Sequence, residues 1–229
     1  MSRIPFKTVE KLLSKPRLSR YLFLSNGNKT KTIKLYKANL QISQSFYPLL
    51  SVLEIVIRNS INEILTLYFN DTDWIINQQN GFLSDNSLRR GNFYLRTEVS
   101  RAIQKLRQNN ARITSGKIIA EQTFGFWTSL LEPHHFRLIQ GKTLNAFPNR
   151  PHGYGRSDIL RELKKIQKFR NRIYHNEPIC FANNQINFST AIDIHTTILE
   201  VLSWIDADFV NWIKDLDNIL KEIRLAQKI

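Results

Sequence analysis

Six consecutive residues, Arg170 to His175 (RNRIYH), combine a fixed cation with a titratable base. An arginine guanidinium is always charged and can hold a phosphate through two parallel hydrogen bonds, whereas imidazole changes its protonation state near neutral pH. Together these two groups are the minimum equipment for cleaving RNA without a metal ion. Asn176, Glu177 and Pro178 follow at once, so the motif closes a long basic stretch.

The positions of these side chains on a helix limit what they can touch together. Residues four apart lie about 40° apart around an ideal helix, so Asn171 and His175 share a face, whereas Arg170 lies about 140° from His175. Arg170 must therefore reach around the helix, or the last turn must loosen, for both to contact one phosphate. Pro178 favours loosening because the residue before a proline avoids the α region. The alternative is that His175 merely ends a helix and that the arginines form a solvated face.

Helical periodicity runs through most of the chain and predicts an all-α bundle. The helix that carries the motif is expected from Asp158 to about His175, with Ser157 as its N-cap. A long amphipathic pattern covers residues 30–69, and Pro48 should kink or split it. Further helices are expected at 8–14, 16–24, 93–109, 133–145, 188–205 and 207–227, with surface loops at 78–92 and 145–155 and a short extended piece at 179–181.

Two segments are expected to be buried. Residues 116–131 are mostly apolar. In the second half of the long pattern, one helix face consists of apolar residues at three- and four-residue spacing, namely Leu50, Leu53, Val56, Ile57, Ile61, Ile64 and Leu65.

The charge distribution indicates an anionic partner. The formal net charge is +14, and basic residues gather in segments 1–46, 89–113 and 156–175, whereas 187–229 carries seven acids and four bases. Such patches favour nucleic acid over an anionic membrane surface. Aromatic residues among the basic segments could stack on unpaired bases, or could simply be core residues; they are Tyr21, Phe23, Tyr36, Phe93 and Tyr94.

Several classes of protein are disfavoured. The chain has one cysteine, Cys180, which excludes an internal disulfide framework and favours a reducing cytoplasm. The first residues lack a signal-peptide pattern, and no apolar run reaches about 18 residues, so a soluble, cytoplasmic protein without a membrane span is expected. No phosphate-binding glycine loop or HExxH motif is present, and no cofactor or metal is expected. His134 and His135 are interpreted as surface or capping residues, and His195 as a packed histidine.

Glu54, Arg58 and Asn59 form a second polar motif in the apolar segment LEIVIRN. An intrahelical pair between Glu54 and Arg58 would stabilise the helix by only about 0.3 to 0.5 kcal/mol. The alternative is that one of them contacts the RNRIYH helix and orients Arg170 or His175.

Three segments in this order resemble the Abi-like abortive-infection proteins of the AbiD/AbiF type. They are LEIVIRNSI at 53–61, FGFWTSLL at 124–131 and KFRNRIYHNEPI at 168–179, and the last contains the R-polar-x3-H signature of HEPN domains. The resemblance covers roughly residues 30–205. It implies a single HEPN-like domain over 1–229, with a basic N-terminal extension at 1–29, a core at 30–205 and a C-terminal helix at 206–229. It also implies a metal-independent endoribonuclease that acts in bacterial defence or as a toxin. Its active site would be formed by the motifs of two chains that face each other in a homodimer.

Carried to this chain, the resemblance implies a role for each residue of the motif. His175 would act as general base or acid, Arg170 would hold the scissile phosphate, and Asn171 would orient the imidazole or a phosphate oxygen. Glu54, Arg58, Asn59 and Tyr174 are the expected supporting residues. The expected RNA-binding cations are Lys164, Lys165, Lys168, Arg172, Arg101, Lys105, Lys34 and Lys37.

Two other functions stay open at the level of sequence. Ten of the 33 basic residues lie in 1–46, which is more than a small nuclease site requires and favours an RNA-binding protein that holds a structured non-coding RNA. Such an RNA could also restrain the nuclease as an antitoxin. A structural protein that works through its acidic C-terminal helices is supported only by the charge asymmetry.

Overall fold

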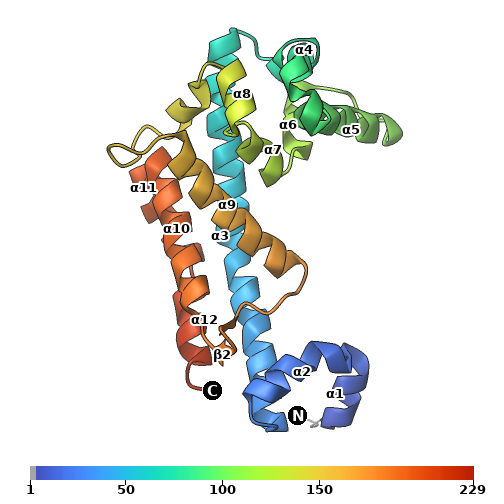
Figure 1. The fold of residues 1–229 in the computed structure, drawn as a ribbon, viewed down its shortest axis with the longest axis vertical. Coiled ribbons are helices and arrows are strands. Elements are labelled where there is room, and N and C mark those ends of the chain that lie inside the picture. Colours follow the sequence, from blue (N-terminus) through green and yellow to red (C-terminus); the bar gives the residue numbers. More distant parts are fainter. Residues whose placement is uncertain (1–3) are drawn as a thin grey trace. The chain divides into compact units, whose positions relative to one another are not determined.

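A computed structural model describes residues 4–229 and is mostly helical, with 74% of residues in helices and 2% in strands. This confirms the predicted all-α class. The helices, drawn in Figure 1, are α1 (Phe6–Leu13), α2 (Lys15–Leu24), α3 (Lys29–Phe69), α4 (Trp74–Asn77), α5 (Tyr94–Gln108), α6 (Ser115–Glu121), α7 (Phe124–Ser129), α8 (Pro133–Leu138), α9 (Arg156–Tyr174), α10 (Ser189–Ile205), α11 (Ala207–Trp212) and α12 (Ile219–Ala226).

The chain forms two compact units. The first comprises residues up to Leu50, Phe169–Thr196 and Ile213–Ile229, and the second comprises Ser51–Lys168 and Thr197–Trp212. Helices α3, α9 and α10 each supply residues to both units.

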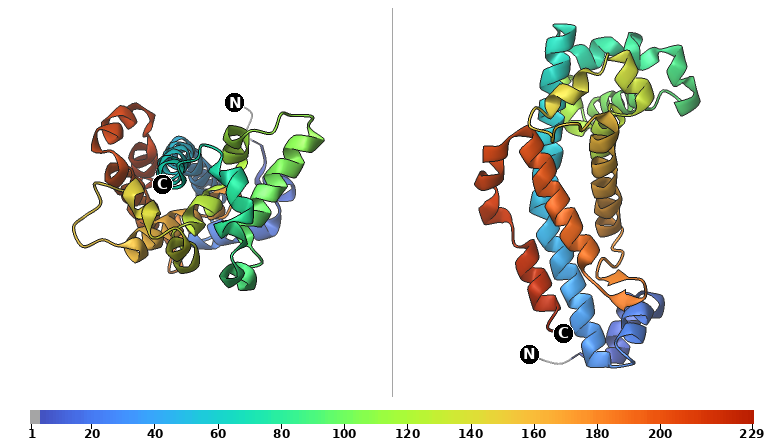
Figure 2. Two further views of the ribbon diagram at one scale, coloured as in Figure 1. Left: turned by 90° about the horizontal axis from the view of Figure 1, so that it is seen from above. Right: turned by 60° about the vertical axis from the view of Figure 1, so that its left-hand side comes forward.

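The first unit is built on the N-terminal half of α3. Figure 2 shows α12 alongside this part of α3, and both helices line a common groove. Its buried side chains include Leu35, Ile42 and Phe46 of α3 and Tyr21 of α2. A two-stranded antiparallel hairpin, β1 (Phe181–Ala182) with β2 (Gln185–Ile186), completes the unit and confirms an extended piece near residues 179–181.

The second unit is built on the C-terminal half of α3. Leu53, Ile57, Ile61 and Leu65 are fully buried, as the apolar spacing predicts, whereas Val56 and Ile64 are only partly buried. The expectation that residues 116–131 are buried is confirmed for most of the apolar side chains of α6, α7 and the turn that follows, which are Ile118, Phe124, Phe126, Trp127, Leu130 and Leu131.

Helix α3 continues through Pro48 for 41 residues, so the predicted split is wrong. Proline removes one backbone donor, but the buried side chains on both sides hold the helix in register. By length and composition alone, α3 is apolar enough to cross a membrane, although the sequence predicts no membrane span. A core helix passes the same test, and the fully buried residues at helical spacing along α3 are typical of one.

Three local predictions are wrong. Residues 78–92 form short 3₁₀ turns with Leu83 and Leu88 buried, not a surface loop. Helix α9 begins at Arg156, so Ser157 lies inside it; the Gly155 amide donates to the Asp158 carboxylate at 3.0 Å, and this bond lowers the pKa of Asp158.

The third concerns the expected helix at 207–227, which is broken into α11, a 3₁₀ turn at Lys214–Leu216 and α12. Between the two helices, Asp217 is extended, with ψ of 102°. Its carboxylate lies 2.5 Å from His195 Nε2 and accepts the amide of Ile219, the first residue of α12. His195 is 4% exposed, so the packed interpretation of this histidine is confirmed.

The 133–145 segment is helical only over α8 and a 3₁₀ turn at Lys142–Ala146, whereas 147–155 is a loop as expected.

Candidate active site

The RNRIYH motif forms the last turn of α9 and lies in the first unit. The Glu177 amide donates to the Arg172 carbonyl at 2.8 Å and the Asn176 amide to the Ile173 carbonyl at 3.0 Å. Asn176 is left-handed, with φ of 54°. These bonds form a Schellman cap in which His175 is the residue between helix and cap.

The predicted loosening of this last turn is wrong. The His175 amide still donates to the Asn171 carbonyl at 2.9 Å, as in a regular α-helix. Asn171 and His175 are therefore one turn apart on the same side of α9, and both are exposed. The chain leaves the helix through the cap at Asn176, before Pro178 can strain the turn.

Arg170 takes a different direction from the one expected. Its guanidinium carbon lies 4.5 Å from the centroid of the Tyr174 ring, a cation–π contact between residues one turn apart. Tyr174, predicted as a supporting residue, therefore contacts Arg170 through its ring, and its role in positioning Arg170 stays a prediction.

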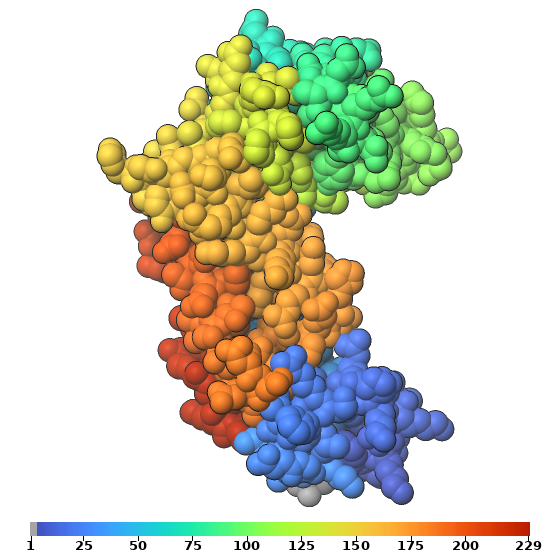
Figure 3. All heavy atoms as spheres, viewed as in Figure 1, coloured from blue at the N-terminus to red at the C-terminus, as the bar shows by residue number. Residues whose placement is uncertain are grey.

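The segment after the cap is fixed by α3 and α2. The Asn39 side chain, 2% exposed, accepts the Ile179 amide at 2.8 Å. The Tyr21 ring packs edge-on against Phe181 at 4.8 Å between centroids. Figure 3 shows the N-terminal helices, in blue, beside the orange segment that follows α9.

A groove of about 390 Å³ lies between α2 and the end of α9. His175, just after α9, lines it together with Arg17 and Arg20 of α2. The full lining, within the part of the chain that the structure describes, is Ser14, Pro16, Arg17, Arg20, Tyr21, His175, Asn176, Glu177 and Pro178. Arg170 and Asn171 do not belong to it, so the cations that share the groove with His175 come from the N-terminal extension.

Among these lining residues the groove carries one carboxylate, that of Glu177. Arg172 holds it, with Nε 3.4 Å from Glu177 Oε2, and Arg172 also donates to the Pro178 carbonyl. Arg172, predicted as an RNA-binding residue, therefore braces the cap and offsets the charge of Glu177. Arg17 and Arg20 leave the groove positive.

Tyr21 of α2 and Cys180 of the segment after α9 are two buried residues that carry a dissociable proton. Burial raises the pKa of the Tyr21 hydroxyl and raises the pKa of the Cys180 thiol to about 12, and a side-chain hydrogen bond joins the two groups. Cys180 is therefore a protonated, structural thiol at neutral pH and not a nucleophile.

Four of the other predicted RNA-binding residues already form salt bridges with acidic side chains. The pairs are Lys164 with Glu132 at 3.0 Å, Lys165 with Glu162 at 2.7 Å, Lys105 with Glu121 at 2.5 Å and Arg101 with Glu98 at 2.5 Å. Exposed pairs of this kind contribute about 0 to 1 kcal/mol, so a phosphate can compete for these cations. Lys34, Lys37 and Lys168 are exposed or partly exposed.

The second polar motif lies in the other unit. Arg58 donates to the Ala120 carbonyl at 3.4 Å, so it holds the end of α6. Glu54 is half-buried and Asn59 is exposed. A role for Glu54 in orienting the RNRIYH motif stays a prediction.

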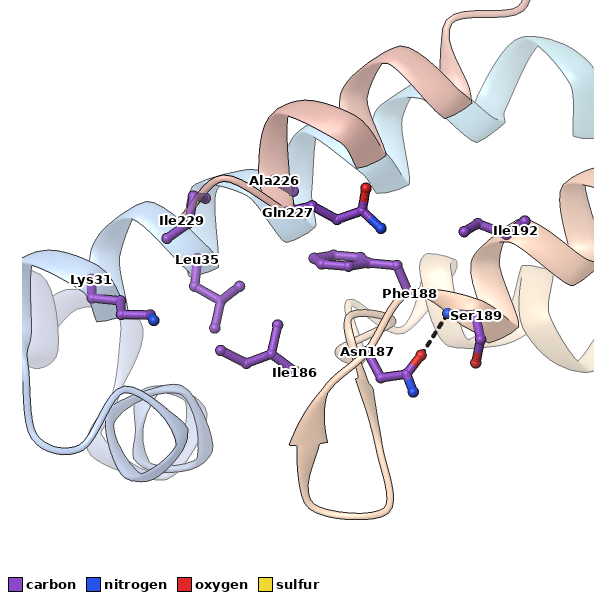
Figure 4. A pocket seen from close by; sticks show the side chains of 10 residues that line it. All are labelled: Lys31, Leu35, Ile186, Asn187, Phe188, Ser189, Ile192, Ala226, Gln227 and Ile229. Atoms are coloured by element: carbon purple, nitrogen blue, oxygen red, sulfur yellow. Dashed lines mark hydrogen bonds between the residues drawn. The ribbon is translucent and has the colours of Figure 1, made fainter.

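Other grooves in the described part of the chain have a different set of groups. One of about 510 Å³, shown in Figure 4, has an apolar floor that includes Leu35, Ile186 and Phe188, with Lys31 as the charged side chain among its labelled residues. A different groove, of about 400 Å³, is lined by residues that include Tyr94, His134 and His135.

His135 is held by a backbone contact. Its Nδ1 lies 2.8 Å from the Ser129 carbonyl oxygen, and burial lowers its pKa. Within residues 4–229, no group of three or more His, Cys, Asp or Glu side chains could hold a metal ion.

Sequence reasoning missed Arg17, Arg20 and Asn39. The one signal for the arginines was the excess of basic residues in the first 46 positions, together with the spacing of Arg17, Arg20 and Tyr21 on one side of a helix.

Comparison of the chain with protein-family models, with curated proteins and with solved structures found no match.

Proposed function

We propose that this protein is a HEPN-type endoribonuclease that cleaves RNA without a metal ion and acts in abortive-infection or toxin-type defence in the bacterial cytoplasm. The observation that carries the proposal is the exposed His175, which lines one positive groove together with Arg17 and Arg20. The HEPN-like arrangement of the bundle is part of the same proposal and is supported by the RxxxxH motif at the end of the long helix α9.

The proposed reaction is attack by the ribose 2′-hydroxyl on the adjacent phosphorus. As general base, His175 takes the hydroxyl proton while the 2′-oxygen bonds to phosphorus and the bond to the 5′-oxygen breaks. The leaving oxygen takes a proton from a general acid, and the products are a 2′,3′-cyclic phosphate and a 5′-hydroxyl. Arg170 stabilises the charge on the phosphate, and Asn171, one turn before His175, orients the imidazole.

One histidine cannot be base and acid at the same moment. Each chain has a single RxxxxH motif, so a second copy of the chain supplies the other group, and the active species is a homodimer. The mass in solution tests this part of the proposal, since a strict monomer that cleaves RNA would contradict it.

The central experiment incubates purified protein with labelled tRNA and mRNA, with and without EDTA. Wild-type protein should cut RNA but not DNA, resist EDTA and leave cyclic phosphate ends. His175→Ala should abolish cutting while RNA binding stays near normal. His152→Ala is the matched control, because His152 is an exposed histidine that does not line the groove. Full activity of His175→Ala would sink the assignment.

A second candidate function is an RNA-binding protein whose nuclease site is silent or restrained by a non-coding RNA. The observation that favours it is the solvent accessibility of the basic residues of the N-terminal segment, including Lys7, Lys11, Lys15 and Lys29. Tight, salt-sensitive RNA binding without cleavage, in the same assay, would select this function over the first.

A further inference from the structure

The N-terminal helix α2 brings two arginines to His175 from a segment outside the RxxxxH motif. Leu18 and Tyr21 are 1% and 2% exposed and anchor α2 in the core of the first unit. Arg17 and Arg20 each precede one of these anchors in sequence and stay exposed at its edge. Their backbone positions are therefore set by packing and do not depend on a ligand.

Arg17 is held at the wall of the groove by the cap of α9. Its Nη1 donates to the Asn176 carbonyl at 2.7 Å. A guanidinium has about five N–H donors, and this bond uses one of them. Arg17 can thus stay docked on the cap while its other donors bind an anion.

Arg20 is held in a different way. Its guanidinium carbon lies 4.9 Å from the centroid of the Phe181 ring, just after the cap segment. A guanidinium placed over a ring keeps its N–H groups at its own edge, where they can bind a phosphate. Two arginines fixed at one groove wall present the forked donors that phosphate oxygens require.

We propose that Arg17 and Arg20 bind a backbone phosphate of the RNA strand beside His175, so that helix α2 is part of the active groove. The proposal rests on the function proposed above and adds two phosphate-binding residues outside the RNRIYH motif. The phosphate they hold is a neighbour of the scissile one, because Arg170 lies outside the groove lining and keeps its own place over Tyr174.

The binding experiment uses a 2′-O-methylated RNA oligonucleotide, which cannot be cleaved by 2′-hydroxyl attack, with fluorescence anisotropy over a range of salt concentrations. Arg20→Gln and Arg17→Gln should each weaken binding about tenfold and reduce the slope of log K against log salt by about 0.7, the value for one lost single-strand phosphate contact. Arg224→Gln is the matched control: it removes the same charge from α12, outside the groove. Equal affinities and slopes in all three variants would overturn the proposal.

Two further measurements locate the site and guard against misfolding. Inorganic phosphate should shift the ring proton resonances of His175 in wild type and in Arg224→Gln, but not in Arg20→Gln. A His175 shift that persists in Arg20→Gln and Arg17→Gln would place the phosphate elsewhere and contradict the proposal. Arg17→Lys keeps the charge and a donor for the Asn176 carbonyl, so it should bind more tightly than Arg17→Gln; equal loss in both would contradict a role for charge at this position.

These measurements separate the two proposals. If the protein never cuts RNA but Arg20→Gln still weakens binding and removes the His175 shift, the nuclease assignment fails and the phosphate site stands. If RNA is cut in a His175-dependent way and the Arg17 and Arg20 variants behave like Arg224→Gln, the phosphate site fails and the nuclease assignment stands.

Discussion

Arg17 Nη1 and the Asn176 carbonyl oxygen are 2.7 Å apart although 159 positions separate the two residues in the chain. The bond joins the second helix of the protein to the cap that ends α9. It makes the conformation of one left-handed asparagine, Asn176, a determinant of where α2 sits beside His175.

The conformation of Asn176 leads to a first prediction. Asn176→Ala should destabilise the protein by about 1 kcal/mol, because only glycine and, less readily, asparagine occupy the left-handed region without penalty. Asn176→Gly should leave the free energy of unfolding unchanged or slightly raise it. Urea unfolding of the three proteins checks this, and equal stability of Asn176→Ala and wild type would contradict the cap geometry.

The contact of Arg170 with Tyr174 leads to a second prediction, about cleavage. Tyr174→Phe keeps the ring beneath the guanidinium and should retain the cleavage rate within about twofold. Tyr174→Leu removes the cation–π contact, worth about 0.5 to 1 kcal/mol at an exposed site, and should lower kcat severalfold. Single-turnover cleavage with each variant provides the comparison; the same rate for both would show that the ring does not position Arg170.

Glu54 gives a third prediction, which addresses the second polar motif. Glu54→Gln should reduce RNA cleavage if the carboxylate orients the RNRIYH motif, and its effect on the free energy of unfolding should stay within about 0.5 kcal/mol. Cleavage rates and urea unfolding are measured on the same preparations. Unchanged cleavage would leave Glu54 with a structural role only.

Ser25, at the end of α2, is the basis of a fourth prediction. It is 3% exposed, and its hydroxyl has no hydrogen-bond partner among the residues that the structure describes. A buried hydroxyl without a partner costs about 1 kcal/mol or more, so Ser25→Ala should stabilise the protein by about that amount. Ser19→Ala is the control, because the Ser19 hydroxyl is exposed and donates to the Pro16 carbonyl. A loss of stability in Ser25→Ala would show that the hydroxyl is bonded in solution.

The fifth prediction concerns alkaline pH. Burial raises the pKa of Cys180 in the folded protein to about 12 from an ordinary 9.0. The stability this provides is fully present below pH 9 and is lost as the pH rises from 9 towards 12, because the unfolded thiol ionises first. The loss is at most about 1.4 kcal/mol per pH unit.

Urea unfolding between about pH 8 and 11, a range that brackets the ordinary thiol pKa, tests the alkaline prediction. Cys180→Ser should show a shallower loss of stability than wild type over this range. Because the pKa of Tyr21 is also raised by burial from its ordinary 10.0, part of the loss should persist in the variant above that pH. Parallel pH profiles for the two proteins would contradict a buried, protonated thiol.

The helices that carry regular apolar spacing were predictable from sequence, and those set by distant contacts were not. The spacing of Leu53, Ile57, Ile61 and Leu65 reports a buried face directly. The break between α11 and α12 contains Asp217, which pairs with His195, 22 positions earlier in the chain, and no local pattern reveals this contact.

The candidate site divides in the same way. The shared face of Asn171 and His175 follows from helix geometry, and the structure agrees with it. The groove does not follow, because Arg17 joins the groove that His175 lines only through tertiary packing of α2. Short 3₁₀ turns such as those at 78–91 have no 3.6-residue period and therefore read as loop.

The single cysteine of the chain gives the protein its own reporter of motion. Cys180 is fully buried and hydrogen-bonded to Tyr21 of α2, so a thiol reagent can reach it only when the structure around it opens. The labelling rate, divided by the rate for a free thiol, measures the equilibrium constant of this opening. An RNA strand that bridges α2 and the end of α9 should slow the labelling. The labelling rate of Cys180, measured with and without RNA, therefore reports whether RNA occupies the groove.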